Sequence, residues 1–152
     1  MNQLRFTQHF EVPVEQAFEL AIDYKRLPEW NVSYVAVDEV TGPPDKVGTK
    51  IYAKIRLLGR TMEGWAKIVE IERPRLVRMT GTSTQGGSLT TTYRFTPVGT
   101  GSDIEILAEY ELPGMFGQVA DKLFVQKAIE RDVRHSLENF KAFVEVKTPV
   151  LA

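Results

Sequence analysis

Hydrophobic and polar positions alternate at the start of the chain and then recur at helical spacing. Residues 3–11, QLRFTQHFE, change between apolar and polar side chains at almost every step, which predicts a half-buried strand. Pro13 suits a first helical position, and the apolar residues after it recur at intervals of three and four, so we expect a short helix over 13–22. Pro28 leaves room for one further turn of helix before Trp30.

Between residues 32 and 111 the chain has the character of a series of strands joined by short turns. We predict strands over 32–40, 49–58, 61–73, 76–83, 88–97 and 102–111. Segments rich in glycine and proline separate them, and consecutive strands with short connections form an antiparallel meander. Together with the first strand, they make a seven-stranded sheet.

The last part of the chain predicts one long helix. About thirty residues from Phe116 onward contain no proline and a single glycine, which at 1.5 Å per residue gives a helix on the order of 45 Å long. One apolar stripe follows it, made by Val119, Leu123, Val133, Leu137, Phe140 and Val144. Because this stripe must be covered and the sheet is the only large partner, we expect residues 1–152 to form a single α+β domain in which sheet and helix pack together.

Composition narrows the classes of function. The chain has 152 residues, with 19 Lys and Arg against 20 Asp and Glu, and no cysteine. The charge balance gives no support to a nucleic-acid partner, and the lack of cysteine excludes disulfide scaffolds, cysteine nucleophiles and thiolate metal sites. No segment has the apolar length of a membrane helix, and the first residues lack the pattern of a signal peptide. We therefore expect a cytoplasmic protein without membrane insertion.

Several short motifs occur in order along the chain. They are VPVEQAF at 12–18, Asp23 with PEW at 28–30, VGT at 47–49, ERPRL at 72–76, YRF at 93–95, the turn at 99–102 and LENFK at 137–141. This series resembles the START-like (SRPBCC) superfamily, and especially its polyketide cyclase/dehydrase and lipid-transport branch. The resemblance implies a helix-grip fold, in which a seven-stranded curved antiparallel sheet wraps around a long C-terminal helix, with two short helices between strands 1 and 2. It also implies an apolar ligand, such as a lipid, sterol or polyketide, in a cavity between sheet and helix.

Alternation along the strands indicates which side chains border such a cavity. The inward faces mix large residues with small ones such as Ala53, Thr91 and Ala108, so part of the volume under the helix is expected to stay open. We expect the ligand to be bound by Trp30, Ile55, Leu57, Trp65, Met79, Leu89, Tyr93, Ile106, Ala108, Phe116, Leu123 and Gln126. The pattern leaves the facing of Trp65 open, and Trp30, Trp65, Met79 and Phe124 would also suit an ordinary filled core.

Two polar positions interrupt the apolar stripe of the long helix. Gln126 and Glu130 continue its repeat. A polar group that faces an apolar cavity binds a carbonyl or hydroxyl group of a ligand, or a water molecule, because an unpaired buried group costs about 1–3 kcal/mol. In the alternative arrangement Val125 and Ile129 turn into the core, which leaves Gln126 at the edge and pairs Glu130 with Arg134.

The sequence contains no recognisable catalytic or metal-binding motif. His9 shares the parity of the polar positions on the first strand, and His135 lies off the apolar stripe beside Ser136, with which it cannot form a nucleophile–base pair. We expect no metal and no cofactor. The leading hypothesis is a monomer or homodimer that binds a lipid-like or polyketide/aromatic small molecule. The alternatives are an aromatase/cyclase-like enzyme acting on a polyketide-type substrate and a protein-interaction module of the same fold.

Overall fold

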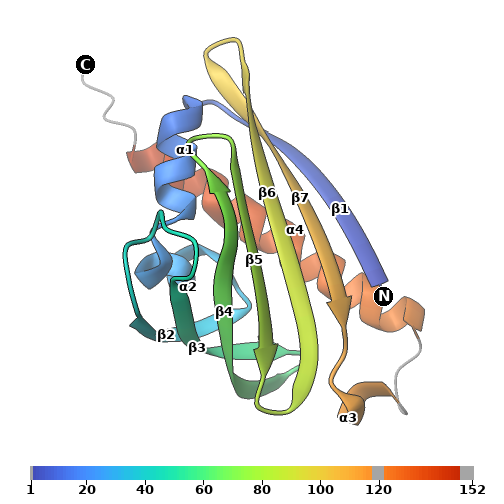
Figure 1. Ribbon diagram of the computed structural model, residues 1–152. Coiled ribbons are helices and arrows are strands. Elements are labelled where there is room, and N and C mark those ends of the chain that lie inside the picture. Colours follow the sequence, from blue (N-terminus) through green and yellow to red (C-terminus); the bar gives the residue numbers. More distant parts are fainter. Residues whose placement is uncertain (1, 118–121, 148–152) are drawn as a thin grey trace.

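Seven strands form one antiparallel sheet in the computed structural model, which describes residues 2–117 and 122–147 (Figure 1). The strands are β1 (Asn2–Phe10), β2 (Tyr34–Val40), β3 (Lys50–Leu57), β4 (Arg60–Glu72), β5 (Leu76–Ser83), β6 (Gly86–Val98) and β7 (Gly101–Glu111). Strands β2 to β7 are neighbours in sequence order, and β1 pairs with β7 at the far edge. The seven-stranded antiparallel sheet predicted from the alternating pattern is confirmed.

The helices lie in the connection between β1 and β2 and after the last strand. Between β1 and β2 lie α1 (Val14–Ala21), the 3-10 turn η1 (Tyr24–Arg26) and α2 (Leu27–Trp30), and after β7 come α3 (Gly114–Gly117) and α4 (Lys122–Lys147). Pro13 precedes α1 as its N-cap residue, and Pro28 lies in the first turn of α2. Proline is tolerated there because the N–H groups of a first turn have no acceptor within the helix. The predicted pair of short helices is therefore present.

The C-terminal helix is shorter than predicted. It has 26 residues and begins at Lys122, whereas the sequence pattern predicted one helix from Phe116 onward. Phe116 belongs instead to α3, a single turn that has glycine at both ends, and glycine is a poor helix former. Residues 118–121, which include Val119 of the predicted stripe, lie outside the described part of the chain.

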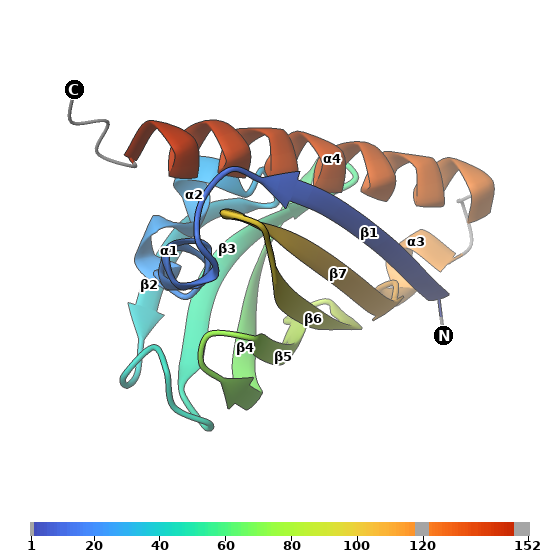
Figure 2. The same cartoon turned by 90° about the horizontal axis from the view of Figure 1, so that it is seen from above.

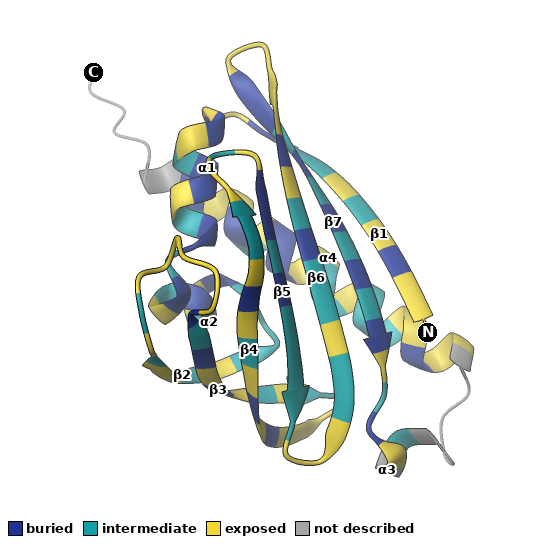
Figure 3. Cartoon of the chain, in the orientation of Figure 1, coloured by how far each residue is buried: buried dark blue, intermediate teal, exposed yellow. Residues whose placement is uncertain are grey.

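Helix α4 lies across the concave side of the curved sheet (Figure 2). It packs against α2, β1 and α1. Its main anchor is Phe140, whose ring meets Phe10 of β1 edge-on at 5.2 Å and Trp30 of α2 at 4.8 Å between centroids. The strands alternate between buried and exposed residues, as expected for a sheet covered on one face (Figure 3). Sheet and helix together form the predicted helix-grip arrangement.

Candidate functional site

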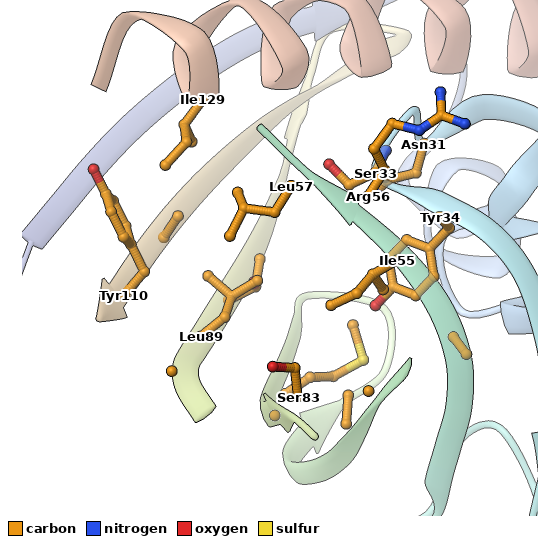
Figure 4. Close-up of a pocket in the computed structure, with 18 of the residues that line it drawn as sticks. Asn31, Ser33, Tyr34, Ile55, Arg56, Leu57, Ser83, Leu89, Tyr110 and Ile129 are labelled. Carbon is orange, nitrogen blue, oxygen red and sulfur yellow. The ribbon is translucent and has the colours of Figure 1, made fainter. Parts of the chain in front are cut away.

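The sheet and α4 enclose a mostly apolar cavity of about 230 Å³ (Figure 4). Its walls come from residues of β2 to β7, from α2 and the loop after it, and from one side of α4. The sheet contributes Ile51, Ala53, Ile55, Leu57, Met62, Met79, Leu89, Thr91, Tyr93, Ile106, Ala108 and Tyr110, and the helices contribute Leu27, Trp30, Ile129, Asp132, Val133, Ser136 and Leu137. The cavity thus lies where the fold family resemblance led us to expect one.

Small residues on the inner face of the sheet leave this space open. Gly64, Ala66 and Gly81 stand side by side on β4 and β5 and border the cavity. Gly81 is required by its surroundings, because a Cβ atom there would collide with the carbonyl oxygen of Trp65 and lie 3.1 Å from the Cα atom of Ala66. The volume that larger side chains would fill is therefore available to a ligand.

Two tyrosine side chains bring hydroxyl groups to the cavity. Tyr34 comes from β2 and Tyr93 from β6, and Figure 4 shows the Tyr34 ring beside Ile55 with its hydroxyl directed into the pocket. Burial raises the pKa of both phenols, and the neighbouring Tyr34 raises that of Tyr93 further, so both groups remain protonated at neutral pH. Neither hydroxyl has a hydrogen-bond partner among the described residues. Both are free to donate a hydrogen bond to a ligand.

A third tyrosine borders the cavity from β7. Tyr110 is 7 % exposed, and its hydroxyl points toward α4 in Figure 4. Burial raises the pKa of this phenol, and the negative charge of Glu130 on α4 raises it further. The phenol therefore stays protonated beside a carboxylate.

The indole N–H of Trp30 is a buried donor without an acceptor in the described part of the chain. Trp30 is 3 % exposed, and its ring packs against Phe140 at the border of the cavity. An unsatisfied buried donor costs about 1–3 kcal/mol. The interior of the site therefore offers more hydrogen-bond donors than the protein itself satisfies.

Nine of the twelve residues expected to bind a ligand border the cavity. These are Trp30, Ile55, Leu57, Trp65, Met79, Leu89, Tyr93, Ile106 and Ala108. Trp65 lies there in a different way from the others, because it pairs with Tyr52 and alternates with Gly64 and Ala66, which places its side chain on the outer face of the sheet. Trp65 is 38 % exposed, and the Nζ atom of Lys50 lies over its indole ring, 5.6 Å from the ring centroid.

The other three predicted residues are not among the described residues that border the cavity. Phe116 lies half-buried in α3, Leu123 is 56 % exposed, and Gln126 is exposed with its amide nitrogen 3.4 Å from Glu130. The predicted stripe is therefore offset at the start of α4, where Val125 and Ile129 face inward instead. Val125 and Ile129 turn inward and Gln126 lies at the edge, as in the alternative arrangement, but among the described residues Glu130 accepts from Gln126 and forms no ion pair with Arg134.

Sequence reasoning missed several polar residues of the site. Tyr34 escaped notice because the register of β2 against β3 shifts between Tyr34 and Ala36 and again between Val37 and Glu39, so simple alternation fails on that strand. Asn31 and Ser33 lie in the loop before it, and Arg56 occupies an outward parity position near the end of β3. Alternation along strands gives no signal for loop residues or for an outward parity position.

The histidines and carboxylates lie mostly elsewhere. His9 contacts Asp103 at 2.7 Å and Glu11 at 3.0 Å, and it does not border the cavity. Within residues 2–117 and 122–147, no three His, Asp or Glu side chains come close enough to hold a metal ion. The same residues contain no helix with the length and hydropathy needed to cross a lipid bilayer.

Known proteins share this fold at low sequence identity. The protein TTHA0849 from Thermus thermophilus is 20% identical with a TM-score of 0.75, covering 97% of this chain and 99% of that one. A START superfamily protein from Mycobacterium smegmatis is 13% identical with a TM-score of 0.75, at 96% and 99% coverage. The Zhui aromatase/cyclase from Streptomyces sp. R1128 is 12% identical with a TM-score of 0.75, at 98% and 96% coverage. At such identities these similarities establish the fold alone.

A family model gives the assignment that the structural comparisons cannot. No curated protein sequence matches the chain significantly. The model described as polyketide cyclase / dehydrase and lipid transport, however, matches residues 1–145, which is nearly the whole chain. The chain therefore belongs to the polyketide cyclase / dehydrase and lipid transport family.

Proposed function

We propose that the protein binds a small hydrophobic molecule in the cavity between the sheet and α4. The observation that carries this proposal is the combination of an apolar cavity with the unpaired hydroxyls of Tyr34 and Tyr93. Apolar walls provide burial, and a few polar groups that converge on the space fix the orientation of a ligand. Because both phenols are protonated, a ligand that carries an acceptor such as a carbonyl oxygen is favoured over one that carries only donors.

The size of the cavity limits the ligand. Its volume of about 230 Å³ is below the roughly 300 Å³ at which small-molecule sites usually begin. The ligand that we propose is accordingly a short chain or one small ring system, rather than a sterol or a lipid with two acyl chains.

The first experiment identifies what the protein carries. Native purification, extraction with organic solvent and mass spectrometry should yield an apolar small molecule in stoichiometric amount. Calorimetry with straight-chain alcohols of about four to twelve carbons then tests the cavity, because each buried methylene adds ~0.8 kcal/mol, or about a fourfold gain in affinity. We expect the affinity to rise at this rate and to level off once the cavity is full. If no alcohol of the series binds and nothing is extracted, the proposal is wrong.

A matched pair of variants locates the binding. In Ala108→Phe the added ring fills the cavity, since Ala108 is buried and borders it. In Leu107→Phe the same ring is introduced at the neighbouring residue, which faces the other side of β7. We expect Ala108→Phe to abolish alcohol binding while Leu107→Phe leaves it unchanged. Equal binding by both variants would place the ligand outside the cavity.

An aromatase/cyclase-like activity is a second candidate, favoured by one feature of the cavity. The two protonated phenols share the space with the carboxylate of Asp132, which borders it from α4. A carboxylate that accepts a proton next to a carbonyl group, together with phenols that donate to the oxygen, is a suitable set for enolisation. Incubation with a polyketide-type substrate tests this candidate, and product formation that survives both Tyr93→Phe and Asp132→Asn would exclude these roles.

A further inference from the structure

One end of the cavity is polar, in contrast to its walls. Asn31, Ser33 and Arg56 border this end, and Figure 4 shows them together next to α4. The backbone N–H of Arg56 donates to the carbonyl oxygen of Ser33 at 2.8 Å, and the backbone N–H of Ser33 donates to Oδ1 of Asn31 at 3.0 Å. These bonds hold the three residues to one another. We call Asn31, Ser33 and Arg56 the rim cluster.

Hydrogen bonds from α4 fix the loop that carries the rim cluster. Ser136 accepts the backbone N–H of Val32 at 3.0 Å, and Asn139 donates to the carbonyl oxygen of Trp30 at 3.2 Å. The loop is thus attached to α4 on both sides of Asn31. A site held in this way binds with little loss of conformational freedom.

The rim cluster has hydrogen-bond donors that the protein leaves unused. The guanidinium of Arg56 has no ion pair among the described residues, and neither the amide nitrogen of Asn31 nor the hydroxyl of Ser33 has a hydrogen-bond acceptor there. Because Oδ1 of Asn31 accepts from Ser33, its NH₂ group is left as the donor available to a ligand. Three different donor groups, one of them charged, therefore lie at the same end of an apolar space.

Two acidic residues, Asp132 and Glu111, border the cavity, and neither forms an ion pair with Arg56 in the described part of the chain. Asp132 has the Nε atom of Arg131 at 3.8 Å and forms no ion pair with Arg56. Glu111, the other carboxylate that borders the described cavity, lies at the end of β7. In the sheet, β7 is separated by β6, β5 and β4 from β3, which carries Arg56. The positive charge of Arg56 is therefore the one that remains open to a ligand.

We propose that the ligand is an apolar acid, whose hydrocarbon part fills the cavity and whose carboxylate is held by Arg56, Asn31 and Ser33. This inference rests on the proposed function and adds the chemical class of the ligand. A guanidinium binds a carboxylate through two parallel hydrogen bonds, which suits a group at the mouth of the cavity where the charge keeps contact with water. Burying the same carboxylate among the apolar walls would instead be strongly unfavourable.

The test compares acids with alcohols of equal chain length. At neutral pH the linear carboxylic acids of about four to twelve carbons are ionised and the alcohols are neutral, so the two series separate the charge from the hydrocarbon. We expect Arg56→Gln to weaken the binding of the acids about tenfold, which is the lower end of the range for a charge-assisted hydrogen bond at a partly exposed site. Alcohol binding should change less than about twofold, because the hydrocarbon contacts are unaltered.

Two further variants control for charge and geometry. Lys54→Gln removes the same charge from an exposed residue of the same strand, which does not border the cavity, and acid binding should be kept. Arg56→Lys keeps the charge but loses the planar fork, so it should restore part of the acid affinity. Raised salt should weaken acid binding by the wild-type protein and leave alcohol binding as it is.

The outcomes distinguish this inference from the proposed function. Alcohols and acids that both bind, and that bind equally well to wild type and Arg56→Gln, would overturn the assignment of the acid site while the hydrophobic cavity stands. An equal loss of acid affinity in Lys54→Gln would show a general charge effect and overturn it as well. If neither series binds the wild-type protein, the proposed function is wrong and the acid site is wrong with it.

Discussion

Phe140 is the side chain through which α4 contacts both the sheet and α2. It is 2 % exposed, and its ring meets Phe10 and Trp30 edge-on at 5.2 and 4.8 Å. Replacement of a buried Phe by Ala costs about 3–5 kcal/mol, and edge-on aromatic pairs add ~0.5–1.5 kcal/mol each beyond the area buried. Since Phe140→Ala loses two such pairs, we expect a loss of about 4–5 kcal/mol, which is a large part of the ~5–15 kcal/mol that stabilises an ordinary domain.

Urea unfolding followed by tryptophan fluorescence measures this loss, and melting curves should shift down by about 8–20 °C at ~2–4 °C per kcal/mol. The matched control is Phe124→Ala on the same helix, because Phe124 is 67 % exposed and its loss should cost less than about 0.5 kcal/mol. Phe140→Leu provides a milder change if the alanine variant does not fold. A cost below about 1.5 kcal/mol for Phe140→Ala, or an equal cost for Phe124→Ala, would refute the role of Phe140 as the anchor of α4.

Three further perturbations test separate parts of the structure. Protonated His9 donates hydrogen bonds to Asp103 and Glu11, and these bonds raise the pKa of the imidazole above its ordinary value of about 6.5. The stability that protonated His9 adds is therefore present below about pH 6.5 and is lost as the pH rises through the pKa of the folded state. His9→Gln should therefore melt below wild type at about pH 5.5 and approach it at about pH 9, and a constant difference would contradict this reasoning. Gly81→Ala should cost about 1–3 kcal/mol in urea unfolding because its Cβ atom collides with the Trp65 carbonyl, whereas Gly114→Ala, which meets no atom within 4 Å, should cost much less. Ser136→Ala removes the acceptor of the Val32 N–H and should cost about 1–3 kcal/mol, with faster hydrogen exchange at that amide; unchanged exchange would exclude the bond.

The alternating pattern of the chain was sufficient to predict the sheet. The concave face of the sheet is turned toward α4, and the spacing of buried residues along β3 and β7 follows the period of two that the sequence shows. The turns carry enough glycine to be found in advance, as at Gly59 and Gly99, which both have positive φ angles. Strand β2, with its two register shifts, hides the direction of its side chains from such reasoning, and the pattern of β4 left the facing of Trp65 open.

The rotation of α4 could not be predicted with the same accuracy. A helix with an ideal period of 3.6 residues drifts relative to any fixed repeat, so the stripe read from Val133 and Leu137 loses its register toward the start of the helix. Val125 is 2 % exposed while Leu123 is 56 % exposed, although both are apolar. The choice between them depends on how α4 packs on β1 and α2, which is a tertiary contact.

The inner face of the sheet is divided into a solid part and a hollow part, and this division relates stability to function. Toward α1 and the end of α4, aromatic rings such as Phe18 and Phe95, 5.3 Å apart, fill the interior. Toward the β3–β4 and β5–β6 hairpins, the inner face carries small residues, namely Gly64, Gly81 and Ala108, and the cavity lies beside them. Phe140 and Phe10 do not border the cavity, so substitutions at small wall residues such as Ala108 leave this contact between α4 and the sheet in place. The solid part can therefore keep the fold stable while substitutions in the hollow part alter the size and polarity of the site, which is how one fold accommodates different ligands.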